Sequence, residues 1–122
     1  MADAVLEDEN NVYYPGLVKR IESGDIQLID VRGKEEALGQ GLIPKSFNLP
    51  FGELKDALNL SDDEFKSKYG QCKPSKTDTN IVFHCGIGKR SIKALAVARA
   101  EGYSLAKNFP GGYKEWAEET KK

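Results

Sequence analysis

Cysteine and histidine are scarce in this chain of 122 residues, which has only Cys72, Cys85 and His84. Two cysteines form at most one disulfide, and a domain of this length does not need one. We therefore expect a reducing intracellular compartment, the cytoplasm. One histidine and two separated cysteines are too few for a zinc site, so we expect neither a metal nor a cofactor.

The chain also lacks a charge imbalance and a long apolar run. Its 18 basic and 19 acidic residues give a net charge of −1, which does not favour nucleic acid or an anionic membrane as a partner. No apolar stretch approaches the ~20 residues of a membrane span. Residues 1–11 are acidic, with no apolar core and no arginine, which argues against a signal peptide and against a mitochondrial transit peptide.

Nothing in the sequence divides it into more than one unit, because it has no internal repeat and no low-complexity linker. A chain of this length buries one core and is too short for two. We expect an acidic flexible tail at residues 1–11, followed by one domain at residues 12–122.

Short apolar stretches alternate with helical patterns along this domain. Strands are expected at residues 26–31, 46–49, 81–84 and 105–109, and helices are expected to begin at Pro15, Glu35, Phe51, Ser61, Ser91 and after Gly112. The better strands are apolar throughout, which is typical of a parallel sheet covered by helices on both faces. We therefore expect an α/β fold, a three-layer α/β/α domain with a mainly parallel central sheet. Ligands of such sheets lie beyond the carboxyl ends of the strands.

The segment Ile-Val-Phe-His-Cys-Gly-Ile-Gly-Lys-Arg-Ser, residues 81–91, places Cys85 at such a strand end. Its two glycines allow several backbone N–H groups to converge on one point, and a helix beginning at about Ser91 directs its positive end there. Two cations add formal charge. All of these features favour the thiolate and lower the thiol pKa from about 8.5, which predicts a nucleophile with an anionic substrate. The residues expected to surround that substrate are Gly86, Ile87, Gly88, Lys89 and Arg90.

The number of residues in this loop indicates which anion it holds. Protein tyrosine phosphatases resemble the segment in having His-Cys, a loop and an arginine, but five residues separate their cysteine from their arginine. Here four residues lie between Cys85 and Arg90. The shorter loop makes a smaller cradle, which suits a persulfide sulfur better than a tetrahedral phosphate. A phosphatase or an arsenate reductase of similar fold is the less favoured alternative.

This loop and three other segments resemble the rhodaneses, which are thiosulfate sulfurtransferases, and the resemblance covers nearly the whole chain after the acidic tail. The matching segments are Leu-Ile-Asp-Val-Arg at 28–32, Gly-Leu-Ile-Pro-Lys-Ser-Phe-Asn-Leu-Pro at 41–50, the loop itself, and Gly102-Tyr103 with Gly-Gly-Tyr-Lys-Glu-Trp at 111–116. Leu42 replaces the family's usual histidine, and Lys45 replaces a glycine. Phe65, Tyr69-Gly70 and Lys73-Pro74 are further similar to small eukaryotic sulfurtransferases that pass sulfur to glutathione.

The resemblance implies a sulfur transfer in two steps. Cys85 would attack the outer sulfur of thiosulfate, release sulfite and hold the sulfur as a persulfide, which a thiol acceptor such as glutathione, or a protein thiol, would then remove. The backbone N–H groups of residues 86–90 would stabilise the persulfide, and Lys89 or Arg90 would bind the oxyanion end of the donor. The alternative from a different class is a binding module that only carries persulfide between proteins.

Other polar residues have supporting or open roles. His84 should point away from Cys85, because neighbouring strand residues alternate between faces, so we expect a buried, hydrogen-bonded histidine that supports the loop rather than a base. Asp30 is expected to bind nearby backbone. Arg32 either meets the donor anion or pairs with a carboxylate. Cys72, in a polar loop, is expected to be an incidental thiol.

Overall fold

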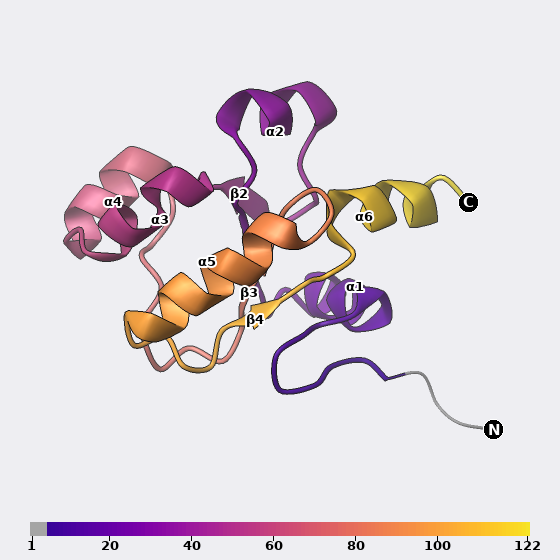
Figure 1. The fold of residues 1–122 in the computed structure, drawn as a ribbon, viewed down its shortest axis with the longest axis horizontal. Helices are drawn as coiled ribbons and strands as arrows, with labels where there is room; N and C mark the ends of the chain where they lie inside the picture. Colours follow the sequence, from indigo (N-terminus) through magenta and orange to yellow (C-terminus); the bar gives the residue numbers. More distant parts are fainter. Residues whose placement is uncertain (1–4) are drawn as a thin grey trace.

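The structure, a computed structural model, describes residues 5–122 and has a four-stranded sheet at its centre (Figure 1). The strands lie in the order β2-β1-β3-β4, with β1 at Gln27–Asp30, β2 at Ser46–Asn48, β3 at Ile81–His84 and β4 at Lys107–Asn108. Every neighbouring pair is parallel, and the register places Asp30 opposite His84. The predicted α/β fold with a parallel central sheet is confirmed, and all four strands end at one edge.

Residues 5–122 form six helices: α1 at Tyr14–Ser23, α2 at Lys34–Gln40, α3 at Phe51–Leu58, α4 at Asp62–Tyr69, α5 at Lys89–Ala100 and α6 at Gly112–Thr120. Helices α2 to α5 connect the strands, α1 precedes β1, and α6 follows β4. Local signals in the sequence set several of their ends. Gly24 ends α1 in the left-handed conformation, with φ +79°, and Ser61 and Glu64 form a capping box at the start of α4. No helix among residues 5–122 is long and apolar enough to cross a membrane.

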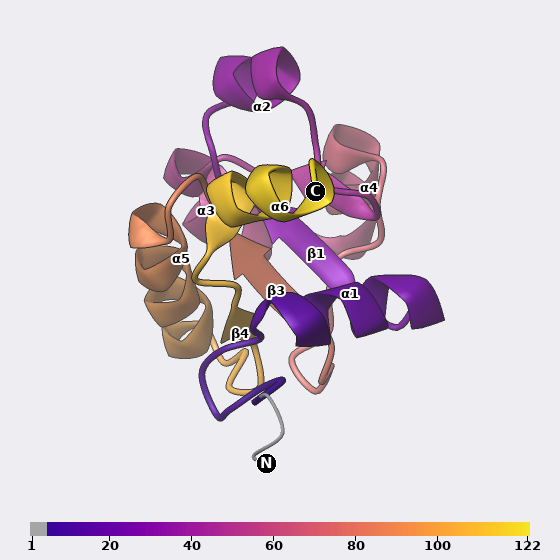
Figure 2. The ribbon, with the colours of Figure 1, turned by 90° about the vertical axis from the view of Figure 1, so that its right-hand side faces the viewer.

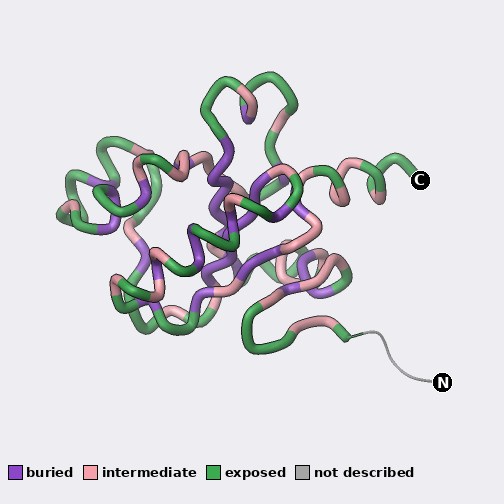
Figure 3. Tube along the Cα trace, viewed as in Figure 1, coloured by how far each residue is buried: buried purple, intermediate pink, exposed green. Residues whose placement is uncertain are grey.

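Helices cover both faces of the sheet and create two hydrophobic cores (Figures 2 and 3). On one face, α3, α4 and α5 pack against β1 and β3 through buried residues such as Leu54, Phe65 and Ala94. On the other face, α1 and α6 pack against the same strands through Leu17 and the half-buried Trp116. The central strands β1 and β3 are buried on both sides except at Gln27, which is why apolar residues occupy most of their positions.

Helix α2 belongs to neither layer. It stands beyond the carboxyl edge of the sheet, joined to the rest of the molecule by two extended segments (Figure 2), and Ala37 is its only buried residue. Its position therefore depends on polar contacts of its ends and side chains, and one of these, between Glu36 and Arg90, leads to the Cys85 loop.

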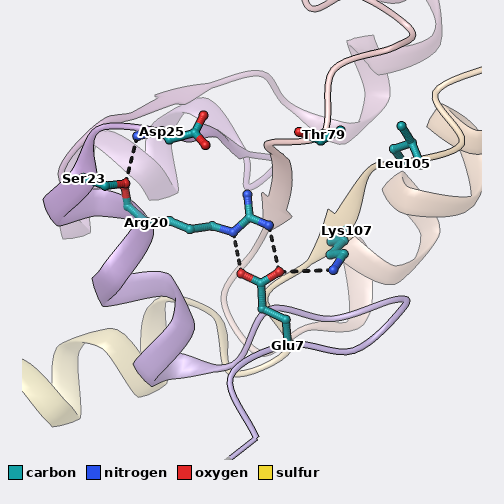
Figure 4. Close-up of a pocket in the computed structure, with 7 residues that line it drawn as sticks. All are labelled: Glu7, Arg20, Ser23, Asp25, Thr79, Leu105 and Lys107. Atoms are coloured by element: carbon teal, nitrogen blue, oxygen red, sulfur yellow. Dashed lines mark hydrogen bonds and ion pairs between the residues drawn. The ribbon is translucent and has the colours of Figure 1, made fainter.

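The segment before α1 differs from the expected flexible tail at residues 1–11. Residues 1–4 lie outside the described part, but Asn11 forms a bridge with Asn108, and Glu7 binds Arg20 and Lys107 at 2.6 and 3.1 Å (Figure 4). Strand β4 leaves unpaired backbone groups at the edge of the sheet, and the N-terminal segment satisfies them. Glu7 lines a pocket of about 520 Å³ at the amino-terminal edge, which is opposite to the edge where Cys85 lies.

Candidate active site

Cys85 directly follows β3 at the carboxyl edge of the sheet, and its side chain is fully buried. Helix α5 begins at Lys89, two residues before the predicted start, with Gly88 as its N-cap at φ +92°. A Cβ atom at Gly88 would lie 2.5 Å from the carbonyl oxygen of Pro110. Only glycine fits there, because both the backbone conformation and the space exclude a side chain.

Three hydrogen-bonding groups surround the Cys85 sulfur. The N–H groups of Gly88 and Ser91 donate to Sγ at 3.1 and 3.4 Å, and Ser91 Oγ lies 3.5 Å from Sγ. Burial raises the pKa of the Cys85 thiol, but hydrogen bonds from the Ser91 hydroxyl and from the N–H groups of Ser91, Arg90 and Gly88 outweigh it. The pKa therefore lies below its usual value, and these hydrogen bonds are its main cause.

The backbone of the loop is held from behind by the first turn of α6. The N–H of Tyr113 donates to the carbonyl of Cys85 at 2.8 Å, and the N–H of Lys114 donates to the carbonyl of Gly86 at 3.0 Å. Since the carbonyl and N–H of one peptide point in opposite directions, the N–H groups that follow these carbonyls point away from α6. Gly112 makes the close approach possible, because a Cβ atom there would lie 2.5 Å from the Gly86 oxygen. This role of Gly112 was not predicted, since the sequence indicated only a turn.

The two cations of the loop have different surroundings. The Arg90 guanidinium forms a bidentate pair with Glu36 of α2, at 2.7 and 2.9 Å. The hydrogen bond to Glu36 is the main cause that raises the pKa of Arg90, and the Cys85 thiolate raises it further against the effect of burial. Lys89 is exposed, and residues 5–122 contain no ion-pair partner for it. Glu36 was missed by the sequence analysis, because nothing local links this helix to the loop.

Arg32 pairs with a carboxylate, one of the two roles that the sequence left open. Its side chain is fully buried, binds both oxygens of Asp30 at 2.7–3.0 Å and donates to the carbonyl of Gly41 at 2.7 Å. The Tyr113 ring lies 4.3 Å from its guanidinium carbon. These contacts favour the structural role of Arg32, with Asp30 as its partner, over the predicted contact with a donor anion.

His84 is buried beneath the loop, as expected. Its Nδ1 lies 3.2 Å from the carbonyl oxygen of Cys85, and its Nε2 lies 4.0 Å from Oδ2 of Asp30. Burial lowers the pKa of His84 more than Asp30 raises it, so the ring is neutral near pH 7. A neutral ring that hydrogen-bonds this carbonyl donates from Nδ1 and supports the loop without facing the sulfur.

The second cysteine lies outside the Cys85 loop, and the possible metal-binding side chains of residues 5–122 do not cluster. Cys72 is exposed in the segment after α4 and is not in a disulfide. No group of three or more metal-binding side chains occurs in this part of the chain.

Comparisons with known proteins agree with this geometry. A family model described as a rhodanese-like domain matches residues 15–119. A mouse protein named thiosulfate sulfurtransferase/rhodanese-like domain-containing protein 3 is 44% identical over 94% of this chain and 73% of its own, and human thiosulfate:glutathione sulfurtransferase is 41% identical over 88% of this chain and 92% of its own. The solved human single-domain sulfurtransferase TSTD1 superposes with a TM-score of 0.86 at 39% identity, over 92% of this chain and 97% of that one. The chain therefore belongs to the rhodanese-like domain family, as its four matching segments predicted.

Proposed function

We propose that the protein is a thiosulfate sulfurtransferase that forms a persulfide on Cys85 and passes the sulfur to a small thiol such as glutathione. The observation that carries this proposal is the hydrogen-bonded cradle around Sγ, in a loop with four residues between Cys85 and Arg90. The relative named thiosulfate:glutathione sulfurtransferase supports the same donor and acceptor.

In the first step, the Cys85 thiolate attacks the outer sulfur of thiosulfate. The S–S bond of thiosulfate breaks, its electron pair leaves with sulfite, and the outer sulfur becomes a persulfide on Sγ. The charges balance, because a thiolate and a dianion become a persulfide anion and the sulfite dianion. The N–H groups of Gly88 and Ser91 are fixed before the reaction, so they stabilise charge at the sulfur without reorganising.

In the second step, an acceptor thiolate attacks the outer sulfur of the persulfide. The bond between this sulfur and Sγ breaks, and its electron pair returns to Cys85, which leaves as a thiolate. The same hydrogen bonds that lower the pKa of Cys85 make it a better leaving group. The cycle needs no metal, oxidant or reductant beyond the donor and the acceptor.

The assay for this proposal is sulfite release from thiosulfate with glutathione as the acceptor. We expect Cys85→Ser to abolish release while its circular dichroism matches the parent, because Cys85 is the nucleophile. Cys72→Ser, the matched control, removes an exposed thiol and should leave the rate nearly unchanged. Turnover by folded Cys85→Ser would contradict the proposal.

The same experiment separates the alternatives. A persulfide carrier would release one equivalent of sulfite and then stop, whatever small thiol is present. A phosphatase would release phosphate from an aryl phosphate, and Cys85→Ser would abolish that release. A phosphoryl group needs donors for three equatorial oxygens, and a loop with one residue fewer than that of a phosphatase disfavours this outcome.

We also propose that the protein acts in a reducing compartment, the cytoplasm. Both cysteines are free thiols, and the proposed chemistry needs Cys85 as a thiolate. Fractionation of cells that express a tagged full-length chain would test the location. Recovery of the protein from an organelle would contradict it.

A further inference from the structure

A pocket of about 590 Å³ opens beside the Cys85 loop, between α2 and α6. The loop contributes Gly86, Ile87 and Arg90 to its lining, and α2 contributes Glu36. Arg90 belongs to the loop that holds the nucleophile, and its guanidinium pairs with Glu36 at the pocket, which links the pocket to this loop. Nothing in the proposed first step uses the part of the pocket formed by α6.

Helix α6 presents alternating charges to this pocket. Lys114, Glu118 and Lys121 all line it, and their spacing of four and three residues places them on one face of the helix. All three are exposed, and residues 5–122 contain no ion-pair partner for any of them. The backbone N–H of Lys114 donates to the carbonyl of Gly86, so this charged face begins directly beside the loop.

We propose that this face of α6 is the binding site for the acceptor thiol, and that the acceptor is glutathione. The inference rests on the proposed function. Glutathione carries two carboxylates and one ammonium group around its thiol, which complements two cations that flank one anion. Lys114 and Lys121 bind the carboxylates, and Glu118 binds the ammonium group.

The dimensions agree with this assignment. Lys121, the C-cap of α6, lies seven positions after Lys114, which is a rise of about 10 Å at 1.5 Å per residue. An extended tripeptide spans roughly the same distance. A ligand that reaches from Lys114 to Lys121 therefore matches glutathione better than a single amino acid thiol such as cysteine.

The chemical step is the transfer already described, with the acceptor now placed. The glutathione thiolate forms a bond to the outer sulfur, the bond from that sulfur to Cys85 breaks, and Cys85 recovers the electron pair. The products are glutathione persulfide and the free enzyme. The side chains of α6 take no part in bond making, so their removal should affect the binding of one acceptor and not the chemistry.

The first test compares acceptors in steady-state kinetics on the full chain. We expect Lys114→Gln and Lys121→Gln each to raise the KM for glutathione by about three- to tenfold, the effect of losing one partly exposed charged contact. The KM for 2-mercaptoethanol, which has no charged group, and the KM for thiosulfate should change less than twofold. Lys122→Gln is the matched control, because it removes the neighbouring charge, which pairs with Glu119 outside the pocket.

A modified ligand tests the contact itself. Glutathione ethyl ester lacks the glycine carboxylate, so the lysine that binds this group should lose its effect on KM when the ester is the acceptor. Equal increases of KM for all acceptors would overturn the proposal, as would an increase of the KM for thiosulfate, which would make these lysines part of the donor site. Unchanged KM values would also overturn it.

Binding without turnover separates this proposal from the proposed function. In Cys85→Ser, a glutathione titration should shift the amide NMR signals of α6, and Lys114→Gln together with Lys121→Gln should weaken the titration. A parent enzyme that turns over 2-mercaptoethanol while α6 fails to respond would refute the acceptor site alone. A parent that gives no sulfite with any thiol would refute the proposed function, and the titration would still decide whether α6 binds glutathione.

Discussion

At the scale of single residues, two backbone N–H groups donate to the sulfur of Cys85, and Ser91 Oγ lies 3.5 Å from it, where its hydroxyl stabilises the thiolate and lowers the pKa. The N–H groups belong to the backbone and remain after a side-chain substitution, whereas the hydroxyl can be removed. Because burial acts in the opposite direction and raises the pKa of the thiol, each lost donor favours the neutral form. Ser91 is therefore the residue at which a side chain's contribution to the thiolate can be measured.

Ser91→Ala should raise the pKa of Cys85, so the pH profile of its alkylation by iodoacetamide should shift to higher pH. At neutral pH the alkylation rate should fall by roughly two- to tenfold, the equivalent of about 0.5–1.5 kcal/mol for one hydrogen bond. Ser67→Ala, at an exposed position of α4, is the control. An unshifted profile for Ser91→Ala would mean that the backbone alone stabilises the thiolate.

Glu36 competes with the donor anion for the Arg90 guanidinium. Removing this carboxylate by Glu36→Gln leaves the N–H groups of Arg90 available, so we expect the KM for thiosulfate to fall by about two- to fivefold, the range of a half-exposed ion pair. Glu35→Gln removes the same charge from an exposed neighbour and should have less effect. If Glu36→Gln raised the KM instead, Glu36 would be needed to position Arg90.

At the scale of elements, the reactive loop is held between two helices. Helix α5 points its N-terminal N–H groups at the sulfur, and the first turn of α6 binds the carbonyls of Cys85 and Gly86 from the other side. The contact with α6 requires glycine at Gly112, because a Cβ atom there would collide with the carbonyls of Cys85 and Gly86. Gly88, the N-cap of α5, must also be glycine, because a Cβ atom there would collide with the carbonyl of Pro110. The geometry of the cradle is thus a property of how these helices are joined and not of the loop alone.

Gly112→Ala tests this contact. A Cβ atom would collide with the carbonyl oxygens of Cys85 and Gly86, and the backbone has φ +65°, so we expect the free energy of unfolding to fall by about 2 kcal/mol or more. Sulfite release should fall more than the loss of folded protein explains, because the loop must move.

Gly52→Ala is the matched control for this substitution. A Cβ atom at Gly52 of α3 meets nothing within 4 Å, and alanine favours a helix, so stability should be unchanged or slightly higher. Urea unfolding and sulfite release measure both variants. A Gly112→Ala protein as stable and active as the parent would show that the loop does not depend on α6.

At the scale of the whole molecule, the N-terminal segment closes the sheet on the β4 side. The N–H of Val12 donates to the carbonyl of Asn108, and the N–H of Asn108 donates to the carbonyl of Asn10, at 2.8 and 2.9 Å. Glu7 adds ion pairs to Arg20 and Lys107. The hydrogen bond from Arg20 is the main cause that lowers the pKa of Glu7 to about 2. Burial raises this pKa, and Lys107 lowers it further.

This shift predicts how stability depends on pH. The pKa of Glu7 is lower in the folded protein than its usual 4.5, so its contribution is complete above about pH 4.5 and disappears as the pH falls toward 2. Glu7→Gln should lower the free energy of unfolding by about 1 kcal/mol at pH 7. Between pH 4.5 and 2, the free energy of unfolding of this variant should fall less than that of the parent.

Urea unfolding at several pH values measures this difference. Glu9→Gln is the control, since Glu9 is exposed and forms no ion pair within residues 5–122. If the free energy of unfolding changed with pH in the same way for Glu7→Gln and the parent, the predicted contribution of this carboxylate to stability would be refuted.

The sequence by itself determined several helix and strand ends and the position of the nucleophile. Strand β3 and the ends of α1 and α4 occur where apolar runs, glycine and the capping box placed them, because these signals act between residues close in sequence. The nucleophile and the loop that holds it were likewise predictable, since Cys85 and its N–H donors lie within seven consecutive residues.

Only the tertiary structure decided which distant groups meet. The Arg32 side chain had two possible partners, and Asp30 became the partner because both are buried together at the same strand end. Glu36 reaches Arg90 across 54 positions, Gly112 meets Gly86, and Glu7 meets Lys107. Such pairs depend on where the helices pack and on the sheet order β2-β1-β3-β4. A charged residue or a glycine in the sequence does not by itself reveal its partner, because long-range packing brings the two together.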